Sequence, residues 1–536
     1  MQKNQIDYSQ TGYFSNLVLD YLAQKDTVKP FYHYPPSLKS VSQITTDLQQ
    51  KEFHRTTLVE ILNRQYTGFE VSESSQFNIN SLLNSDTFTI VTGHQPCLFT
   101  GPLYFLYKII SAINLSKQLN ELYPTKHFVP VYWIGSDDHD FEEINHIRLF
   151  GKTITWHQPV RTATGRLSTN TLQPVFDELK TLVGEGKNSE ELLQLLEKAY
   201  LQHKTLAQAT RYLVNELFGQ YGLVIIDQDD AQLKGLFAPT IKQELLEAKS
   251  YRLVQDANTQ LQQFGYVNQA FPRPINLFYL TDDFRERIER TDDTYTVNQT
   301  GITFTEAEIL QELETHPERF SPNVILRPVY QQTVLPSVAY IGGGGELAYW
   351  LQLASVFQHY GVNYPMLILR NSVLWIDASN VAKIKAIPLN PQDLFTEVET
   401  LVADYVTSNS QHTLNLSEQK ELAKQLFDQI QQQVLAIDPT LQASVLAEAA
   451  KVNNGIDNLE AKILKAEKRK FDTTVQQIRS MKARFFPNNS LQERHDNFIP
   501  YYLQYGKEFI THLVEALDPL DFRFTILQAE NKSLEK

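Results

Sequence analysis

Two short segments hold most of the side chains that could do chemistry. The first, residues 92–108, reads TGHQPCLFTGPLYFLYK. Gly93 and His94 directly follow a β-branched run, so we expect them where a strand ends and turns toward a helix. Free backbone amides at such a helix start favour a carboxylate or a phosphate. The segment therefore predicts an anion site, and its candidate contacts are Gly93, His94, Gln95, Thr100 and Lys108, although Lys108 could also be a solvated charge.

The second segment, residues 135–146, reads GSDDHDFEEINH and is rich in acidic residues and histidine. We favour general acid/base chemistry, in which Asp138, Asp140 and Glu143 hold a substrate amine and His139 moves a proton. A metal centre is a second interpretation, because His139, Glu143 and His146 would share one helix face. A solvated acidic helix start is the third. The H-E-x-x-H order is absent, so we predict no metal cofactor.

A third segment, residues 340–350, reads YIGGGGELAYW, and its glycines allow a ligand to approach the backbone closely. We expect this at Gly343 and Gly344, whereas Glu346 could receive an amine or simply cap the following helix. Consecutive glycines do not match G-x-G-x-x-G, so a nicotinamide site is not predicted. Further substrate contacts are expected from Trp133, Asn323 and Arg327.

The elements that must position these residues follow an α/β pattern. Five apolar runs, each followed by a polar or glycine-rich loop, predict strands at 88–91, 128–134, 223–226, 338–341 and 366–369. Such runs favour a parallel sheet, whose ligands bind at the carboxyl ends of the strands. We expect this core over residues 1–390, with insertions at about 151–218 and 237–327.

Residues 391–490 lose the strand signals and predict a helical arm. Apolar residues from Val445 to Ala466 are spaced alternately four and three apart, as in a coiled-coil seam, which restarts one residue late at Phe471. Asp438-Pro439 separates this seam from an earlier amphipathic segment, which favours a helical hairpin. The hairpin could pack on its own core or pair two subunits, and we favour a homodimer. Residues 491–536 are expected to pack back on the arm or the core.

Composition narrows the class of protein. The 536 residues carry a net charge of −14 and lack a long basic stripe, so we expect no nucleic-acid partner. A single cysteine, Cys97, fits a reducing cytoplasm, and we find no activating partner that would make it a nucleophile. No signal pattern and no apolar run of 18 residues is present, so no membrane association is predicted.

Taken together, the motifs resemble the BshC family of cysteine-adding enzymes in bacillithiol biosynthesis. The matching pieces are TGHQPCLFTGPLYFLYKII, VPVYWIGSDDHDFEEINH, SPNVILRPVYQQTVLPSVAYIGGGGELAYW and FFPNNSLQERHDNF, in the family's order. The resemblance implies a Rossmann-like, nucleotidyltransferase-type core with connecting-peptide insertions and a C-terminal α-helical coiled-coil domain. It also implies that Gly93-His94-Gln95 take the place of a synthetase HIGH-type signature, with Asp138, His139 and Asp140 in the same cleft.

The implied reaction is an ATP-dependent amide ligation between cysteine and glucosaminyl-malate, in which His94 steadies a developing phosphate charge. Near the last family motif, Arg494, Tyr501 and Tyr505 could hold the nucleotide by charge and stacking; alternatively, Arg494 only caps a helix. Two other hypotheses are a metal-dependent hydrolase using His139, Glu143 and His146, and a non-catalytic scaffold built on the arm.

Overall fold

The computed structural model describes residues 1–387 and 389–529. The chain forms two compact units. The first consists mainly of Lys3–Leu374 and Gln492–Leu527, and the second mainly of Trp375–Leu491. The last residues of the predicted tail, 530–536, lie outside the described part. Over that part, no helix combines the length and the apolar character needed to cross a membrane.

A five-stranded parallel sheet forms the centre of the first unit. Its order is β13-β12-β2-β3-β6, and every neighbouring pair is parallel. All five predicted strand runs enter this sheet, which confirms the expected α/β core. Strands buried on both faces are apolar along their whole length, which explains why these runs stand out in the sequence. The strands are β2 (Thr87–His94), β3 (His127–Ile134), β6 (Val224–Asp227), β12 (Ser337–Gly342) and β13 (Met366–Leu369).

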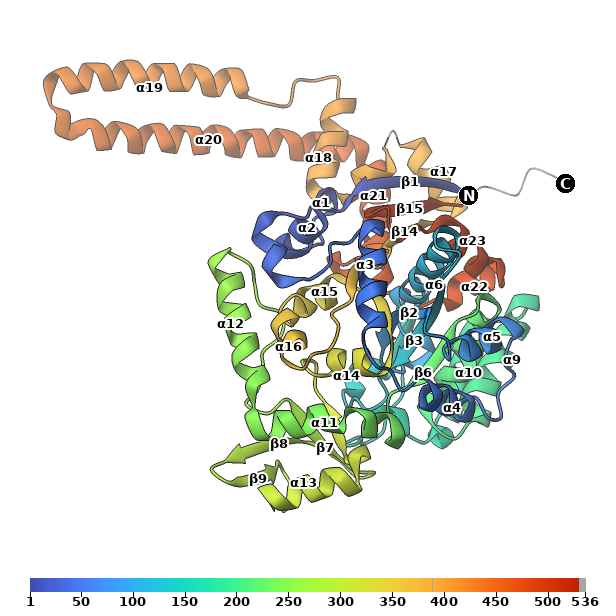
Figure 1. The fold of residues 1–536 in the computed structure, drawn as a ribbon. Coiled ribbons are helices and arrows are strands. Elements are labelled where there is room, and N and C mark those ends of the chain that lie inside the picture. Colours follow the sequence, from blue (N-terminus) through green and yellow to red (C-terminus); the bar gives the residue numbers. More distant parts are fainter. Residues whose placement is uncertain (388, 530–536) are drawn as a thin grey trace. The chain divides into compact units, whose positions relative to one another are not determined.

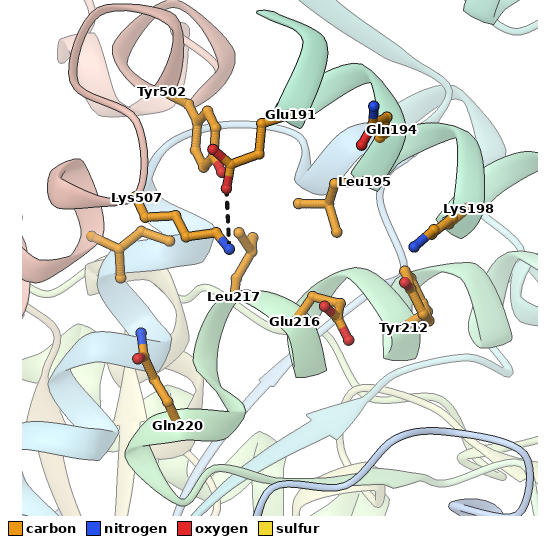
Figure 2. A pocket seen from close by; sticks show the side chains of 11 residues that line it. Glu191, Gln194, Leu195, Lys198, Tyr212, Glu216, Leu217, Gln220, Tyr502 and Lys507 are labelled. Atoms are coloured by element: carbon orange, nitrogen blue, oxygen red, sulfur yellow. Dashed lines mark ion pairs between the residues drawn. The ribbon is translucent and has the colours of Figure 1, made fainter. Parts of the chain in front are cut away.

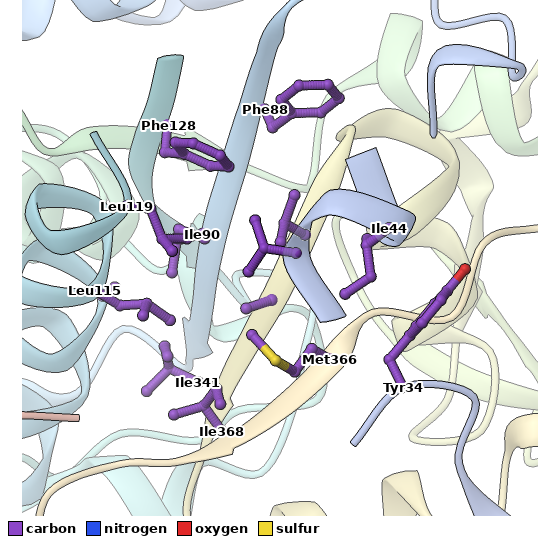
Figure 3. Close-up of a cluster of buried hydrophobic side chains, with 14 of the residues drawn as sticks. Tyr34, Ile44, Phe88, Ile90, Leu115, Leu119, Phe128, Ile341, Met366 and Ile368 are labelled. Atoms are coloured by element: carbon purple, nitrogen blue, oxygen red, sulfur yellow. The ribbon is translucent and has the colours of Figure 1, made fainter. Parts of the chain in front are cut away.

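A cluster of buried apolar side chains fixes the sheet against two helices (Figure 3). Ile90 of β2, Ile341 of β12 and Ile368 of β13 contribute to it from the strands. Helix α6 (Tyr104–Leu122) adds Leu115, and helix α3 (Leu38–Gln49) adds Ile44. Tight packing of this kind holds the strand ends in place, so the loops that leave them start from a rigid base.

The sequence predicts a helix over about residues 103–122 with Pro102 at its first position, and the structure forms this helix from Tyr104 to Leu122. Phe99, Thr100 and Gly101 take positive φ angles of 45°, 70° and 64°. The N-cap of α6 is Leu103, and the helix begins at Tyr104. A left-handed turn therefore precedes the helix, and Pro102 lies before its cap.

Two insertions extend the sheet topology. Between β3 and β6 lie the hairpin β4 (His146–Leu149) and β5 (Lys152–Thr155) and the helices α8 (Gln173–Val183), α9 (Lys187–Gln202) and α10 (Leu206–Phe218). After β6 come α11 (Ala231–Glu247), α12 (Lys249–Gln263), a small sheet, helix α13 (Glu306–Thr315) and α14 (Arg327–Val334). The small sheet is antiparallel, with the order β10-β9-β8-β7-β11. Its strands are β7 (Leu277–Leu280), β8 (Arg285–Thr291), β9 (Thr294–Val297), β10 (Thr303–Thr305) and β11 (Phe320–Pro322).

The remaining elements of the first unit surround this core (Figure 1). A three-stranded sheet has the order β1-β15-β14 and brings together the first and last strands of the described chain. These strands are β1 (Gln2–Asp7), β14 (Val373–Ile376) and β15 (Arg523–Gln528). The other helices are α1 (Tyr8–Thr11), α2 (Asn16–Leu22), α4 (Arg55–Gln65), α5 (Glu73–Ser81), α15 (Gly344–Trp350), α16 (Ala354–His359), α22 (Ile499–Tyr505) and α23 (Glu508–Ala516).

The second unit is helical and contains a long hairpin. Helices α19 (Ser417–Ile437) and α20 (Gln442–Lys468) lie side by side (Figure 1). Lys420 of α19 pairs with Asp457 and Glu460 of α20. A 3₁₀ turn at Arg469–Phe471 then separates α20 from α21 (Asp472–Phe485), where the apolar spacing shifts by one residue. Helices α17 (Ala378–Ala386) and α18 (Val398–Asn409) complete the unit.

The hairpin buries only part of its apolar surface within one chain. Val445 is buried, but Leu459 is 54% exposed and Leu422 is 64% exposed. The apolar residues of this region that stay exposed are Leu422, Leu426, Leu435, Ile437, Leu441, Leu446, Val452, Leu459 and Ile463. The predicted seam is therefore present, and most of it faces outward.

Candidate active site

A large cavity lies at the carboxyl ends of the parallel strands. Its volume is about 770 Å³, within the range of small-molecule sites. The residues that follow β2, β3, β6, β12 and β13 all contribute to its wall. Of the residues predicted from the sequence, it gathers Gly93, His94, Gln95, Lys108, Trp133, Asp138, His139, Glu143, Asn323, Arg327, Gly343, Glu346 and Arg494.

Five predicted residues do not line this cavity: Thr100, Asp140, Gly344, Tyr501 and Tyr505. Thr100 is buried in the left-handed turn before α6. Asp140 is exposed at the start of α7 (Phe141–Ile144). A side chain at Gly344 would meet Phe14 at 3.6 Å, on the side of the N-terminal segment. The buried Tyr501 donates a 2.8 Å hydrogen bond to Asp496. Of the three residues expected to hold a nucleotide, only Arg494 reaches the cavity.

Gln95 joins the two segments that dominate the sequence. Its side-chain amide donates to Asp138 Oδ2 at 2.9 Å and to Glu143 Oε2 at 3.4 Å. Burial alone would raise the pKa of Asp138, but Arg285 and hydrogen bonds outweigh it and hold this pKa below its usual value. Burial and then Asp140 raise the pKa of Glu143. The two carboxyls therefore share one donor but differ in acidity.

The helix expected to carry a metal centre is too short. Helix α7 ends at Ile144, so His146 opens strand β4 instead of sharing a helix face with His139 and Glu143. His146 Nδ1 lies 3.0 Å from the side-chain oxygen of Asn145. Within residues 1–387 and 389–529, no group of three or more His, Cys, Asp or Glu side chains could hold a metal ion. The interpretation that His139, Glu143 and His146 share one helix face and bind a metal was therefore wrong.

A buried network of a hydrogen bond and an ion pair holds the acidic loop at Asp137 in place. The sequence did not reveal this network. Asp137 is 1% exposed and accepts a 2.8 Å hydrogen bond from Ser321 of β11. Lys234 of α11 lies 3.7 Å from the same carboxylate oxygen. Close packing at Gly165 adds to this support, because a Cβ there would lie 2.4 Å from the Cβ of Ser136. The loop is held by contacts from both insertions.

Lys108 and Glu346 satisfy each other. Lys108 Nζ, almost fully buried, lies 2.7 Å from Glu346 Oε2 and also donates to the Gly93 carbonyl. Glu346 accepts further hydrogen bonds from Gly343 N at 2.9 Å and Tyr340 Oη at 2.6 Å. Burial opposes ionisation of Glu346, but Lys108 and these donors lower its pKa to about 2. The pair therefore fixes α6 against α15, and neither residue is free to hold a substrate charge alone.

Arginine residues line much of the remaining wall. Arg273, Arg287 and Arg494 are exposed and have no acidic partner within the described part of the chain. Arg370 pairs with the buried Glu493 at 2.8 Å, and Arg327 donates to Tyr349 at 2.7 Å. The sequence pointed to Arg327 and Arg494 only. Arg370 directly follows strand β13. Because ligands bind at the carboxyl ends of parallel strands, Arg370 could have been predicted from the sequence as well.

Cys97 lies beside the cavity but is held as a thiol. Its sulfur is 3.6 Å from His94 Nδ1, a neighbour that the sequence did not reveal. Burial and then the charge of Glu143 raise the pKa of this thiol to about 12, against the opposing charge of Lys108. The nucleophilic thiolate is therefore disfavoured near neutral pH, in agreement with the sequence interpretation.

A second, smaller hollow of about 150 Å³ lies between α9, α10 and the helices α22 and α23 (Figure 2). Lys507 and Glu191 already pair across it at 3.1 Å. It contains none of the catalytic or substrate-binding residues predicted from the sequence. The large cavity is thus the candidate active site.

Comparison with known proteins places the chain in a family. A model described as "Bacillithiol biosynthesis BshC, N-terminal Rossmann-like domain" matches residues 1–371, and its C-terminal coiled-coil counterpart matches residues 373–529. The chain belongs to the BshC family. The match spans both units and agrees with the Rossmann-like sheet and the helical hairpin.

Curated BshC relatives match over nearly their full length. Proteins of Christiangramia forsetii and Flavobacterium johnsoniae are each 45% identical, covering 98% and 97% of this chain and 99% of either relative. A Bacillus thuringiensis relative is 28% identical over 96% of this chain and 97% of its own. All three are named "Putative cysteine ligase BshC". The relatives of this chain in the BshC family are thus named as cysteine ligases.

Solved structures match only weakly. A Mycobacterium tuberculosis methionyl-tRNA synthetase in complex with methionyl-adenylate covers 81% of this chain and 92% of its own, at 10% identity and a TM-score of 0.23. A likeness at this level carries no argument about the BshC cavity.

Proposed function

We propose that this BshC chain joins cysteine to glucosaminyl-malate by an amide bond, with ATP activating the cysteine carboxylate. The observation that carries the proposal is one cavity with two chemically different walls, in a chain whose relatives are named as cysteine ligases. The reaction would be the last step of bacillithiol biosynthesis. The single, protonated cysteine fits a cytoplasmic enzyme.

The acidic wall suits an amine. Asp138 keeps a lowered pKa and so remains charged near neutral pH, where it can hold an ammonium group. Glu143 has a raised pKa, which makes it the better proton acceptor of the two. Both carboxyls accept a hydrogen bond from the side-chain amide of Gln95, which orients them.

The arginine wall suits anions. Arg273, Arg287 and Arg494 offer guanidinium groups without an acidic partner among the described residues. Guanidinium groups bind carboxylates and phosphates in a bidentate manner. The two carboxylates of the malyl group and the phosphates of ATP are both anions of the kind that these guanidinium groups bind.

Activation is needed because a carboxylate and an amine do not condense by themselves near neutral pH. In the proposed sequence, a cysteine carboxylate oxygen attacks the α-phosphorus of ATP and pyrophosphate leaves. The acceptor amine then attacks the acyl carbon, the C–N bond forms, and AMP leaves with the electrons of the C–O bond. The proton of the amine passes to a carboxylate of the acidic wall.

The test is a ligation assay with purified protein, cysteine, glucosaminyl-malate and each nucleoside triphosphate in turn. Mass spectrometry should show the cysteinyl product together with AMP and pyrophosphate in equal amounts. Release of ADP instead of AMP would show that the cysteine carboxylate is activated as an acyl phosphate and not as an adenylate. Absence of the product with every nucleotide would overturn the ligase assignment.

We also propose that BshC acts as a homodimer through the hairpin. The exposed apolar residues of α19 and α20 support this, because water-exposed seams of this length are normally covered by another helix. The substrates are small molecules, and the net charge of −14 does not favour a nucleic-acid partner.

A further inference from the structure

The hydrogen-bond partner of His94 determines which of its ring nitrogens carries the proton. His94 Nδ1 lies 3.0 Å from the backbone carbonyl oxygen of Gln95. A carbonyl oxygen can only accept, so Nδ1 must be the N–H of the neutral ring. The Cys97 thiol, at 3.6 Å, is a much weaker competitor for the same nitrogen. Nε2 of His94 then has a lone pair and no proton.

The partner of His139 leads to the opposite result. His139 Nδ1 lies 2.7 Å from Nη1 of Arg285. A guanidinium group has only donors, so Nδ1 must be the acceptor and Nε2 must carry the proton of the neutral ring.

Arg285 cannot turn away from His139 without losing its other contacts. Its side chain is 6% exposed and lies 3.9 Å from the centre of the Phe278 ring. Nε donates to Ser321 Oγ at 3.0 Å, and Nη2 donates to the Pro322 carbonyl at 3.2 Å. Each edge of the planar group is therefore engaged, and the direction of Nη1 is fixed.

We infer that the two histidines of the cavity are held in opposite tautomers, with Nε2 of His94 an acceptor and Nε2 of His139 a donor. Their roles rest on the proposed function. His94 accepts a hydrogen bond from the substrate amine, and His139 donates one to the oxygen that gains charge as the C–O bond breaks. Arg285 is the positioning residue for His139. This assignment exchanges the roles that the sequence suggested, where His94 faced the phosphate and His139 moved a proton.

The charges around both rings agree with neutral forms. Burial, and then Lys108, lower the pKa of His94 to about 4, against Glu346 and together with Arg370. Burial and Arg285 lower the pKa of His139, while Asp138, Asp140 and Glu286 oppose them. Neither ring is expected to be an imidazolium near neutral pH.

The direct test is nitrogen NMR of the full chain labelled with ¹⁵N-histidine, with assignments from His94→Gln and His139→Gln. At pH 7 the two rings should show opposite patterns, with a protonated Nδ1 in His94 and a protonated Nε2 in His139. A protonated Nδ1 in His139, or a protonated Nε2 in His94, would overturn the inference. The spectrum needs no turnover, so it remains readable even if the ligation assay fails.

Substitution of the arginine tests the positioning role. Arg285→Met removes the donor, so the His139 spectrum should change to a mixture of tautomers and its pKa should rise. Arg285→Lys keeps one donor and should retain more of the native pattern. The matched control is Arg287→Met, because Arg287 lines the same cavity and lies 6.0 Å from the same Phe278 ring centre. An unchanged His139 spectrum in folded Arg285→Met would show that Arg285 does not set the tautomer.

Kinetics separate a donor from a base at His139. His139→Gln keeps an N–H donor and an acceptor for Arg285, whereas His139→Leu keeps neither. If His139 donates, the Leu variant should lose about 10²-fold in kcat and the Gln variant much less. Equal losses in the two variants would contradict a donor role, whatever the size of the loss.

Discussion

Single buried charges in the cavity wall depend on their partners for stability. Lys108→Met would leave Glu346 buried without its cation. We expect a loss of about 3–5 kcal/mol in the free energy of unfolding, measured by urea denaturation. The double variant with Glu346→Gln should recover part of this loss. Lys117→Met is the control, because Lys117 is an exposed residue of the same helix α6. If Lys108→Met is as stable as that control, the ion pair does not stabilise the fold.

The low pKa of Glu346 also makes a prediction about acid stability. Because its folded pKa of about 2 is below the ordinary value of 4.5, the ionised carboxylate stabilises the fold above about pH 4.5. This contribution should be lost as the pH falls from about 4.5 toward 2. Urea midpoints measured between pH 6 and pH 3 should therefore fall more steeply for the native chain than for the double Lys108→Met, Glu346→Gln variant. Parallel curves would contradict the pKa assignment.

Residues of the cavity differ in how far the sequence could predict them. His94 ends strand β2 and Asp138 lies in the loop that leaves strand β3, and any parallel sheet places such residues at one edge. Arg285 has no such signal, because it belongs to an antiparallel strand of an insertion whose packing against the core is a long-range property. Tyr501 shows the opposite kind of error. It was predicted to hold the nucleotide because it lies near Arg494 in the sequence, but its hydroxyl donates a hydrogen bond to Asp496 in the interior.

Short turns behind the acidic loop position it as much as the strand before it does. Gly165 donates its N–H to the Ser136 carbonyl at 2.8 Å, and an added Cβ has no room. Gly165→Ala should lower the free energy of unfolding by about 1–3 kcal/mol through overpacking, and it should reduce ligation by displacing the loop. Thermal unfolding and the ligation assay measure the two effects. Gly301→Ala, where a Cβ meets nothing within 4 Å, should change neither.

Helix α20 contains a glycine that, unlike Gly165, has room for a side chain. Gly455 lies inside this helix, and a Cβ there would meet nothing within 4 Å. Gly455→Ala should therefore stabilise the hairpin by about 1 kcal/mol, because alanine loses less backbone entropy in a helix. Hydrogen exchange of the α20 amides should slow in the variant. Faster exchange would mean that the helix needs the glycine.

Element boundaries followed the sequence where local signals were strong. The one-residue shift in the apolar spacing matches the 3₁₀ turn at Arg469–Phe471, because a new register needs a change in helical winding. Helix α6 begins within one residue of the predicted start, but three consecutive residues with positive φ occupy the turn before it. Local preference could not reveal that turn, which holds Phe99 and Thr100 in conformations that side chains rarely adopt.

At the scale of the whole molecule, the exposed seam predicts association. Light scattering should give a molar mass of twice the 61.7 kDa of one chain. Leu459→Glu should give a monomer, because it puts a charge into the apolar set, whereas Asn454→Glu on the other side of α20 should not. A monomeric native chain would show that the hairpin packs on itself alone.

The division into a parallel core and a helical arm was predictable because composition and periodicity both change along the chain. The assembly of the cavity was not, since its wall comes from segments more than a hundred residues apart, such as Asp137 and Pro322. No local pattern encodes which insertion strand meets which core loop.

The hydrogen bond from Arg285 to His139 crosses from the inserted antiparallel sheet to a loop of the parallel core. The insertion is therefore a working part of the enzyme and not an appendage. A shortened chain that lacks β7 to β11 would keep the strands of the parallel sheet but lose the group that sets the protonation pattern of its own histidine. Chimeras that exchange this insertion between relatives should work only when the arginine and the histidine are inherited together.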